Sequence, residues 1–239
     1  MDLIDKVAYI TGGTKGIGYG TAKVLLNAGM RVAISGRRQE DVENAAKSLG
    51  DSSGVFGVVS DVTNFEDEKN AVQKITAHFG QLDAVLANAG VGIFSSVDEM
   101  SAEDFDQMMK TNLYGVFHTL KASVEELKKS EGYYITLASL AGTNFFEKGA
   151  GYNATKFGVV GFTQAAMLDL RRYNIKVSTI MPGSVATYFN NHVPDEKDGW
   201  KIQPEDIGQL VLDLLKMNPR TLPSKIEVRP TRPGGNPSI

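Results

Sequence analysis

Tyr152 and Lys156 are four residues apart, so on a helix they share one face. A phenol with a pKa near 10 is a poor acid–base catalyst at neutral pH. A nearby ammonium group favours the phenolate, and lowering the phenol pKa by about three units requires roughly 4 kcal/mol. This pair could therefore transfer a proton to or from a substrate oxygen.

The same spacing occurs at Tyr19 and Lys23, so spacing alone does not identify a catalytic pair. Tyr19 lies just inside the first expected helix, where its phenol is most simply a packing residue with a polar tip. Tyr152 opens the helix after the fifth expected strand, and Ser139 ends that strand. Taken alone, Ser139 could be a loop hydroxyl and Lys156 a solvated charge. Their order along the chain favours the second pair as the catalytic one.

A glycine-rich turn near the N-terminus lies between a short apolar strand at 7–10 and a helical stretch that runs to residue 29. A helix start offers unpaired N–H groups and a partial positive charge, which suit phosphate. Gly12 permits a tight turn, Gly16 lets the backbone approach a pyrophosphate, and Gly18 lets the helix lie close to the strand. The turn predicts a dinucleotide site with these contacts: Gly12, Thr14, Lys15, Gly16, Ile17 and Gly18.

The form of this turn, T-G-x-x-x-G-x-G, resembles that of the short-chain dehydrogenase/reductase family, including its NADPH-dependent 3-oxoacyl-carrier-protein reductases. The resemblance covers about residues 5–229. It implies that a serine holds the substrate carbonyl oxygen, a tyrosine transfers the proton, and a lysine holds the nicotinamide ribose and lowers the tyrosine pKa. A helix asparagine supports a water-linked proton relay, although alone it could be a helix cap. The matching residues are Asn112, Ser139, Tyr152 and Lys156.

The end of the second strand indicates which nicotinamide cofactor the site prefers. An NAD site normally has an Asp or Glu there, whereas this sequence reads Ser-Gly followed by Arg37 and Arg38. A guanidinium can pair with a ribose 2′-phosphate through two hydrogen bonds. Lys15 and Arg37 match the bases of NADP-preferring relatives, and Arg38 is a weaker candidate. The arginines could instead be a solvated helix start. We expect NADP(H).

Three further segments resemble cofactor-binding segments of the family. One lies against the adenine, one follows the fourth strand, and one follows the sixth strand and holds the nicotinamide amide. The acidic residue of the first could instead only start a helix, and the Pro-Gly of the third could be an ordinary turn. The residues are Asp61 and Val62; Asn88, Ala89 and Gly90; and Pro182, Gly183, Val185 and Thr187.

Composition excludes several classes of function. The 239 residues carry a net charge of −3, which argues against nucleic acid or an anionic membrane as partner. The absence of Cys excludes disulfides, thiolate metal sites and a Cys nucleophile. Three dispersed histidines suggest no metal cluster, so we expect no metal site. No basic-then-apolar leader and no apolar run of about 18 residues are visible, so we expect a cytoplasmic protein.

Strand-like and helix-like stretches alternate along the chain. This pattern predicts a single Rossmann-type doubly wound α/β domain over residues 1–239, with a seven-stranded parallel sheet and helices on both faces. A capping box at Thr63 and Glu66 is expected to start one helix, and a long helix is expected to begin at about Asn112. The strands are expected at 7–10, 31–35, 55–59, 82–87, 133–137, 176–181 and 225–228.

The least regular segment, residues 183–203, follows the sixth strand on the side where ligands bind. We expect it to be a substrate lid, the alternative being a solvated loop, and His192 within it could touch substrate. Residues 231–239 are expected to be a loose tail. Some aromatic residues near the expected pocket could line it, although core packing is an equal alternative for each: Phe94, Phe145, Phe146, Tyr188, Phe189 and Trp200.

We therefore expect an NADP(H)-dependent reductase of a small carbonyl compound, with Tyr152 as general acid, and the resemblance makes a 3-oxoacyl compound one candidate substrate. One alternative is an NAD(P)⁺-dependent alcohol or 3-hydroxy-acid dehydrogenase, and another is a catalytically silent NADP(H)-sensing regulator. The resemblance implies a homodimer or homotetramer formed through the two long helices. Small residues on the second allow close approach: Ala154, Gly158, Gly161, Ala165 and Ala166.

Overall fold

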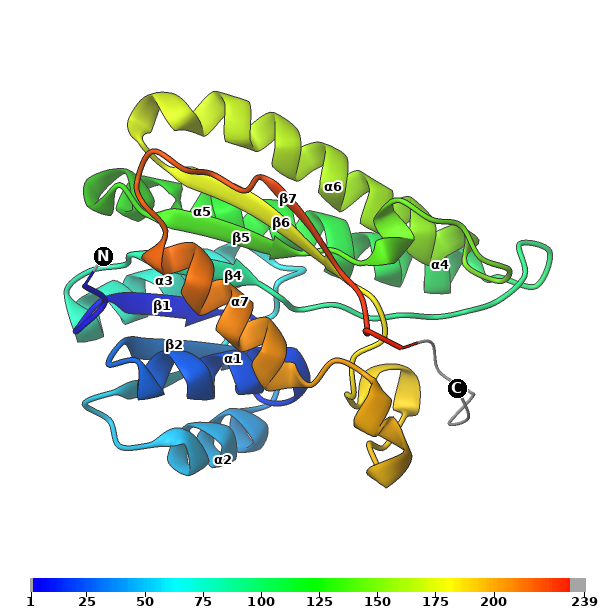
Figure 1. Ribbon diagram of the computed structural model, residues 1–239, viewed down its shortest axis with the longest axis horizontal. Helices are drawn as coiled ribbons and strands as arrows, with labels where there is room; N and C mark the ends of the chain where they lie inside the picture. The colour runs from blue at the N-terminus through cyan, green and yellow to red at the C-terminus, as the bar shows by residue number, and fades with distance from the viewer. Residues whose placement is uncertain (1, 233–239) are drawn as a thin grey trace.

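A computed structural model describes residues 2–232, which form one parallel sheet with helices on both faces (Figure 1). The sheet order is β3-β2-β1-β4-β5-β6-β7. The strands are β1 (Val7–Ile10), β2 (Arg31–Gly36), β3 (Val55–Val59), β4 (Ala84–Ala87), β5 (Tyr133–Leu137), β6 (Lys176–Pro182) and β7 (Lys225–Val228). The prediction of a doubly wound fold with seven parallel strands is confirmed.

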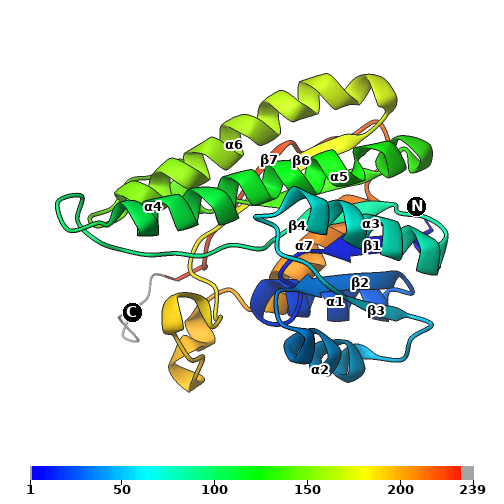
Figure 2. The ribbon, with the colours of Figure 1, turned by 180° about the vertical axis from the view of Figure 1, so that it is seen from behind.

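The helices form one layer on each face of the sheet (Figure 2). One layer contains α1 (Gly16–Asn27), α2 (Gln39–Leu49) and α7 (Pro204–Lys216), and the other contains α3 (Phe65–Phe79), α5 (Gly115–Ser130) and α6 (Ala150–Leu170). Because both faces are covered, the central strands are apolar throughout, and all residues of β1, β4 and β5 are buried.

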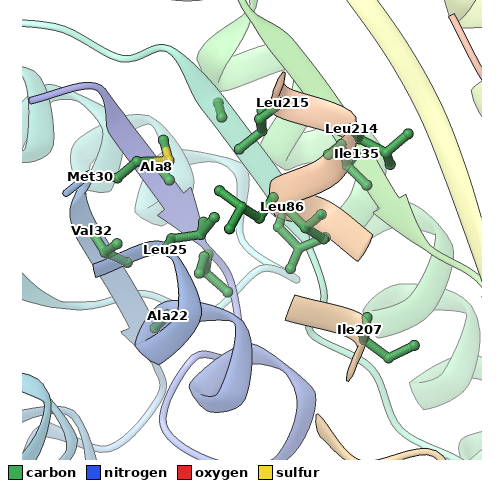
Figure 3. Packing of buried hydrophobic residues seen from close by; sticks show 14 of the residues in the cluster. Ala8, Ala22, Leu25, Met30, Val32, Leu86, Ile135, Ile207, Leu214 and Leu215 are labelled. Carbon is green, nitrogen blue, oxygen red and sulfur yellow. The ribbon is translucent and has the colours of Figure 1, made fainter. Parts of the chain in front are cut away.

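Close packing on the first face fixes α1, the helix that begins at the glycine-rich turn. Leu214 and Leu215 of α7 belong to the same buried cluster as Leu25 of α1 and Leu86 of β4 (Figure 3). A Cβ atom on Gly208 of α7 would lie 2.9 Å from the Thr21 Cα of α1, so only glycine fits there without displacement. The turn is therefore attached to a rigid support.

The strand order reverses at β1, which pairs with β2 on one side and β4 on the other. In such sheets ligands bind beyond the carboxyl ends of the strands at this point. The segment between β6 and α7 also begins at that edge, and its short helical turns, coloured gold, lie apart from the helical layers (Figure 1). The fold therefore brings several distant segments to one edge.

The prediction that a long helix begins at about Asn112 is wrong. Helix α4 (Ala102–Met109) continues through a π-helical turn at Lys110–Tyr114 directly into α5. No proline interrupts this stretch, and the wider turn accommodates the extra residue without ending the helix. Asn112 is buried within the π turn rather than at a helix start.

Two other boundaries differ from the prediction. Helix α3 is capped by Asn64, whose side chain accepts a hydrogen bond from the Glu66 amide at 3.0 Å. The Thr63 hydroxyl instead donates to Asp61 Oδ1 at 2.8 Å, so the expected capping box does not form. β4 begins at Ala84, two residues later than expected, because the Asp83 carboxylate is engaged by the Val7 amide at 2.8 Å.

The segment 183–203 is more ordered than a plain loop. It contains two 3₁₀ turns, Phe189–Asn191 and Glu196–Trp200, and a bridge between Val185 and Ile202 closes its base. Of the expected tail, residues 233–239 lie outside the described residues. Within residues 2–232, none of the helices has both the length and the apolar character needed to cross a membrane.

Candidate active site

The glycine-rich turn has the backbone shape that a phosphate site needs. Gly12 and Gly16 have φ angles of +64° and +57°, in the left-handed region that favours glycine. A Cβ on Gly18 would lie 2.7 Å from both Asn88 Nδ2 and Gly12 O, so the helix can approach the strand only without a side chain. The turn borders a cavity of about 440 Å³, lined by Thr14, Lys15, Gly16, Tyr19 and Tyr188.

Asn88 and Ala89, at the end of β4, hold this turn in place. The Asn88 side chain donates to the carbonyl oxygens of Thr11 and Gly12, at 2.8 and 3.0 Å. The amides of Asn88 and Ala89 both donate to the Thr11 hydroxyl, at 3.0 and 3.1 Å. The Asn88 side chain therefore supports the turn, and Thr11 is a supporting residue that the sequence analysis missed.

The basic residues around the end of β2 have different surroundings. Lys15 is exposed at the N-cap of α1, and Arg37 is exposed directly after β2. The Arg38 guanidinium makes two hydrogen bonds to the Asp41 carboxylate, at 2.7 and 2.9 Å. Among residues 2–232, no hydrogen bond or ion pair engages the Arg37 guanidinium. Lys15 and Arg37 are thus free to meet an anion, whereas Arg38 is already paired.

Ser139, Tyr152 and Lys156 converge at the carboxyl end of β5. Ser139 follows this strand, and its hydroxyl accepts a hydrogen bond from the Ala141 amide at 3.1 Å. Tyr152 and Lys156 lie on α6, and the Lys156 Nζ is 5.6 Å from the centre of the Tyr152 ring. The Lys156 ammonium donates to the Leu137 carbonyl at 3.0 Å, which fixes it under the end of the strand.

Burial controls the ionisation of this pair. Desolvation raises the pKa of Tyr152 to about 12, and a hydrogen bond with the Ser139 hydroxyl offsets part of the rise. Desolvation lowers the pKa of Lys156 to about 8. Among the protein's own groups, loss of water around the Tyr152 phenol outweighs its neighbours, and the lowering of its pKa by Lys156 together with a bound oxidised nicotinamide stays a prediction. At neutral pH Tyr152 is a protonated phenol.

Asn112 connects the site to the loop after β4. Its side-chain oxygen accepts from the Val91 amide, and its amide nitrogen donates to the Val91 carbonyl, both at 2.8 Å. The same nitrogen donates to the Thr155 hydroxyl at 3.1 Å. Gly90, between Asn112 and Lys156, is exposed, and a Cβ there would lie 3.8 Å from the lysine Nζ. Asn112 therefore holds the loop against α6.

The residues after β6 form the opposite wall. Pro182 is the last residue of β6, and the Gly183 amide donates to the Val228 carbonyl at 2.8 Å. Val185 takes part in the bridge that closes the base of the lid segment. A Cβ on Gly16 would lie 3.5 Å from the Thr187 side chain, so Thr187 lies next to the glycine-rich turn, which we also call the phosphate turn. Segments after β1 and β6 are thus in contact.

The comparisons with known proteins agree with this geometry. The family model described as short chain dehydrogenase matches residues 6–198. The chain belongs to this family. It is 33% identical, over 95% of its length and 98% of the relative, to an oxidoreductase of Staphylococcus aureus (strain USA300) that is described as uncharacterized.

Two solved structures share the whole fold. An alcohol dehydrogenase of the archaeon Thermococcus sibiricus, complexed with 5-hydroxy-NADP, has a TM-score of 0.89 and 30% identity, with 98% of this chain and 99% of that chain covered. A 3-ketoacyl-(acyl-carrier-protein) reductase of Brucella melitensis, complexed with NADH, has a TM-score of 0.89 and 26% identity, with 96% and 99% covered. The chain is an oxidoreductase of the short-chain dehydrogenase family, whose fold binds a nicotinamide cofactor.

The remaining site residues of this short-chain dehydrogenase fall into two groups. Asp61 Oδ1 accepts from the amide and hydroxyl of Thr63, and Val62 is buried, with its carbonyl 2.9 Å from His118 Nδ1. Asp61 thus shapes its own turn. His192, expected as a possible substrate contact, instead meets Asp198 inside the lid segment.

Asn153 was not among the predicted site residues, whereas Tyr188 was expected as a possible pocket residue and Tyr19 as a packing residue. Asn153 donates to the carbonyls of Ala141 and Asn144, at 2.6 and 2.7 Å, and so fixes the loop after Ser139. Tyr19 and Tyr188 line the cavity at the phosphate turn. The spacing of Asn153, next to Tyr152 on α6, was a visible signal, whereas the place of Tyr188 depends on the path of the lid segment.

Proposed function

We propose that this protein reduces the carbonyl group of a small ketone with NADPH, with Tyr152 as the general acid. The observation that carries this proposal is a buried tyrosine that is protonated at neutral pH and lies beside the Ser139 hydroxyl, at the edge of the sheet where the cofactor turn lies. A protonated phenol at this place is a proton donor. The glycine turn, with Gly12 and Gly16 in the left-handed region, supports a dinucleotide at the same edge.

The protein's own groups would divide the work as follows. The bound nicotinamide supplies the reducing equivalent. The Ser139 hydroxyl donates a hydrogen bond to the substrate oxygen, where negative charge develops. The Tyr152 phenol transfers its proton to that oxygen. Lys156, held by the Leu137 carbonyl, places a positive charge beneath the phenol and favours its ionised form as the proton leaves.

A protonated Tyr152 phenol suits the reduction direction, in which it gives its proton to the substrate oxygen. An alkoxide is more basic than a phenolate, so proton transfer from Tyr152 to the new alkoxide is favourable. Oxidation of an alcohol would instead use the Tyr152 phenolate as the base that accepts the proton. An alcohol or 3-hydroxy-acid dehydrogenase therefore remains the second candidate, and the alcohol dehydrogenase among the similar structures supports it.

The surroundings of β2 support NADPH over NADH. Arg37 follows the strand directly, Lys15 lies in the turn, and both are exposed. A 2′-phosphate between them would gain charge-assisted hydrogen bonds, and no carboxylate stands at the end of β2 to bind a 2′-hydroxyl. Arg38 contributes less, because Asp41 already accepts its hydrogen bonds.

Two measurements test this proposal. Oxidation of NADPH, followed with a panel of uncharged and 3-oxoacyl ketones, should show turnover with at least one ketone, and no turnover with any would contradict it. Dissociation constants should favour NADPH over NADH, and Arg37→Ala should weaken NADPH about tenfold, the effect of losing one charged hydrogen-bond partner. Arg38→Ala is the matched control and should change it by less than about threefold. A preference for NADH would remove the argument from Lys15 and Arg37.

We also propose that residues 183–203 act as a substrate lid.

We further propose that the protein is a homodimer or homotetramer formed through α5 and α6. These helices carry exposed apolar side chains, including Phe117 and Phe157, and the Gly161 face of α6 has open space around it. An exposed apolar face of this kind supports close helix approach. Light scattering after gel filtration should give a mass of two or four chains, and a monomer would contradict this.

A further inference from the structure

An aromatic cluster surrounds the catalytic phenol. Phe94, from the loop after β4, meets the Tyr152 ring edge-on, with ring centres 5.4 Å apart and planes at 79°. Phe189, from the lid segment, meets the same ring at 5.7 Å and 55°. Phe94 and Phe189 meet each other at 6.3 Å and 62°. Three rings from three separate segments thus form a cage, which we define as Phe94, Tyr152 and Phe189.

The cage depends on a glycine. A Cβ atom on Gly92 would overlap the Phe189 ring and would lie 3.3 Å from the Phe94 ring. Any side chain at this position must therefore displace Phe189, because aromatic rings cannot yield by bending. Gly92 allows the lid phenylalanine to lie directly on the backbone of the loop after β4. The approach of these two segments is thus built into the sequence.

The lid segment crosses between the two halves of the site. At its start, Thr187 lies next to Gly16 of the phosphate turn, and the Thr187 hydroxyl accepts a hydrogen bond from the Phe189 amide at 3.3 Å. Two residues later, Phe189 reaches Gly92 on the opposite side. The cage therefore borders the Tyr152 phenol, to which the proposed reaction brings the substrate carbonyl.

The cage is apolar and partly open. Phe94 and Phe189 are each 37% exposed, which is high for phenylalanines that border a buried site, whereas Tyr152 is 8% exposed. Within the lid segment, Asp198 lies 2.6 Å from Lys201 and also binds His192, and no charged side chain takes part in the contacts among the three rings of the cage. The surface offered to a substrate is therefore aromatic and uncharged.

We infer that the substrate is an uncharged ketone that carries an aromatic ring, and that Phe94 and Phe189 hold this ring. A flat ring placed beside them can make edge-to-face or offset contacts with both, and such contacts stabilise aromatic pairs beyond simple burial. A saturated ring of the same carbon number fills the same space without them. Phe94 and Phe189 are therefore specificity-determining residues. This inference rests on the proposed carbonyl reduction.

The test compares 4-phenyl-2-butanone with 4-cyclohexyl-2-butanone, whose carbonyl groups are separated from the ring and have the same intrinsic reactivity. With saturating NADPH, kcat/KM should favour the phenyl compound by about tenfold, the combined effect of two aromatic contacts. Phe94→Leu and Phe189→Leu should each reduce this ratio to below about threefold. Gly92→Ala should do the same while both phenylalanines remain, because it displaces Phe189.

Phe56→Leu is the matched control. Phe56 lies on the edge strand β3 and stacks on His78 with ring centres 4.4 Å apart, outside the cage, so its variant should keep the tenfold ratio. The NADPH dissociation constant of each variant, measured by cofactor fluorescence, should stay within about twofold of the parent and so exclude misfolding.

The outcomes separate the two proposals. Reduction of both ketones with equal efficiency would overturn the aromatic substrate and leave carbonyl reduction standing. A tenfold ratio that persists in Phe189→Leu and Gly92→Ala would overturn the role of the cage. Failure to reduce these two ketones or any other carbonyl compound would overturn both proposals.

Discussion

The two Tyr-x-x-x-Lys pairs of this chain have the same spacing and opposite surroundings. The Tyr19 phenol lies 2.9 Å from the Ser48 hydroxyl near the surface, and Lys23 is 3.6 Å from Glu205 with its side chain 58% exposed. Tyr152 and Lys156 are both buried, and burial shifts the pKa of each. The same motif thus gives surface packing in α1 and a candidate proton-transfer site in α6.

The difference comes from the neighbours that each tyrosine meets, because both helices start at the carboxyl edge of the sheet. Tyr19 lies in the first turn of α1, and its hydroxyl contacts the Ser48 hydroxyl of α2. Tyr152 lies in the first turn of α6, directly after the loop that carries Ser139. The four-residue spacing puts a tyrosine and a lysine on one helix face. A nearby serine such as Ser139, and burial that excludes water, depend instead on which segments pack against that face.

The largest effect expected is on turnover. Tyr152→Phe should lower kcat for ketone reduction by about 10²- to 10⁴-fold, the range for loss of a general acid. Tyr19→Phe should change kcat by less than about twofold, because that phenol binds only Ser48. Steady-state rates at saturating NADPH measure both. Equal losses in the two variants would break the comparison.

The second effect concerns the lysines. Lys156→Met should lower kcat/KM by about 10²-fold, similar to the loss of one preorganised electrostatic contact near the reacting oxygen. Lys23→Met removes an exposed charge and should leave kcat/KM within about twofold. The same assay compares them, and an active Lys156→Met enzyme would show that the buried ammonium plays no part.

A third effect appears in stability against pH. The folded pKa of Lys156, about 8, lies below the usual value of 10.5, so between these values the unfolded chain binds more protons than the native one. The native protein should therefore gain stability relative to Lys156→Met as pH rises from about 8 to 10.5, by on the order of 3 kcal/mol. Tyr152, with a pKa of about 12 in the native protein, affects this difference only near and above pH 10, where the phenol of the unfolded chain ionises.

Urea unfolding at pH 8 and pH 10 measures this difference. Lys23→Met serves as the control, because it removes an exposed lysine of α1, and its difference from the parent should stay constant. A Lys156→Met difference that does not change with pH would mean that the ammonium is hydrated in the native protein.

The smallest effect concerns the surface pair. Loss of the Lys23–Glu205 contact, at 3.6 Å and with both side chains about half exposed, should change the free energy of unfolding by less than about 0.5 kcal/mol. Glu205→Gln, measured by urea unfolding, tests this. A loss above about 1 kcal/mol would show that α1 and α7 depend on this ion pair as well as on their glycine contacts.

Much of the fold could be predicted from the sequence because the signals are local. Apolar strand runs, a Ser101 cap whose hydroxyl accepts from the Asp104 amide at 3.0 Å, and Gly80 in the left-handed region after α3 all match their patterns. The wrong predictions concern single positions at the starts of two helices. Asn64 caps α3 in place of Thr63, and Asn112 lies in a π turn that has no sequence signature.

The sequence predicts which residues form the site. It does not predict the pKa shifts of these residues or the aromatic cage. The turn glycines, Ser139, Tyr152 and Lys156 meet as the family pattern implies. The rise of the Tyr152 pKa depends on how many atoms surround the phenol, which is a property of the packed state. The contact between Phe189 and Gly92 joins segments about a hundred residues apart, and no periodic pattern encodes such a pairing.

The central claim is that Ser139 and Tyr152 act as one unit on the substrate oxygen. The most direct test measures kcat for Ser139→Ala, Tyr152→Phe and the double variant at saturating NADPH and ketone. Residues that act together give strongly non-additive losses. The account predicts that the double variant turns over within about threefold of Tyr152→Phe alone. A loss equal to the product of the two single losses would mean that the two hydroxyls act independently, and would contradict the account.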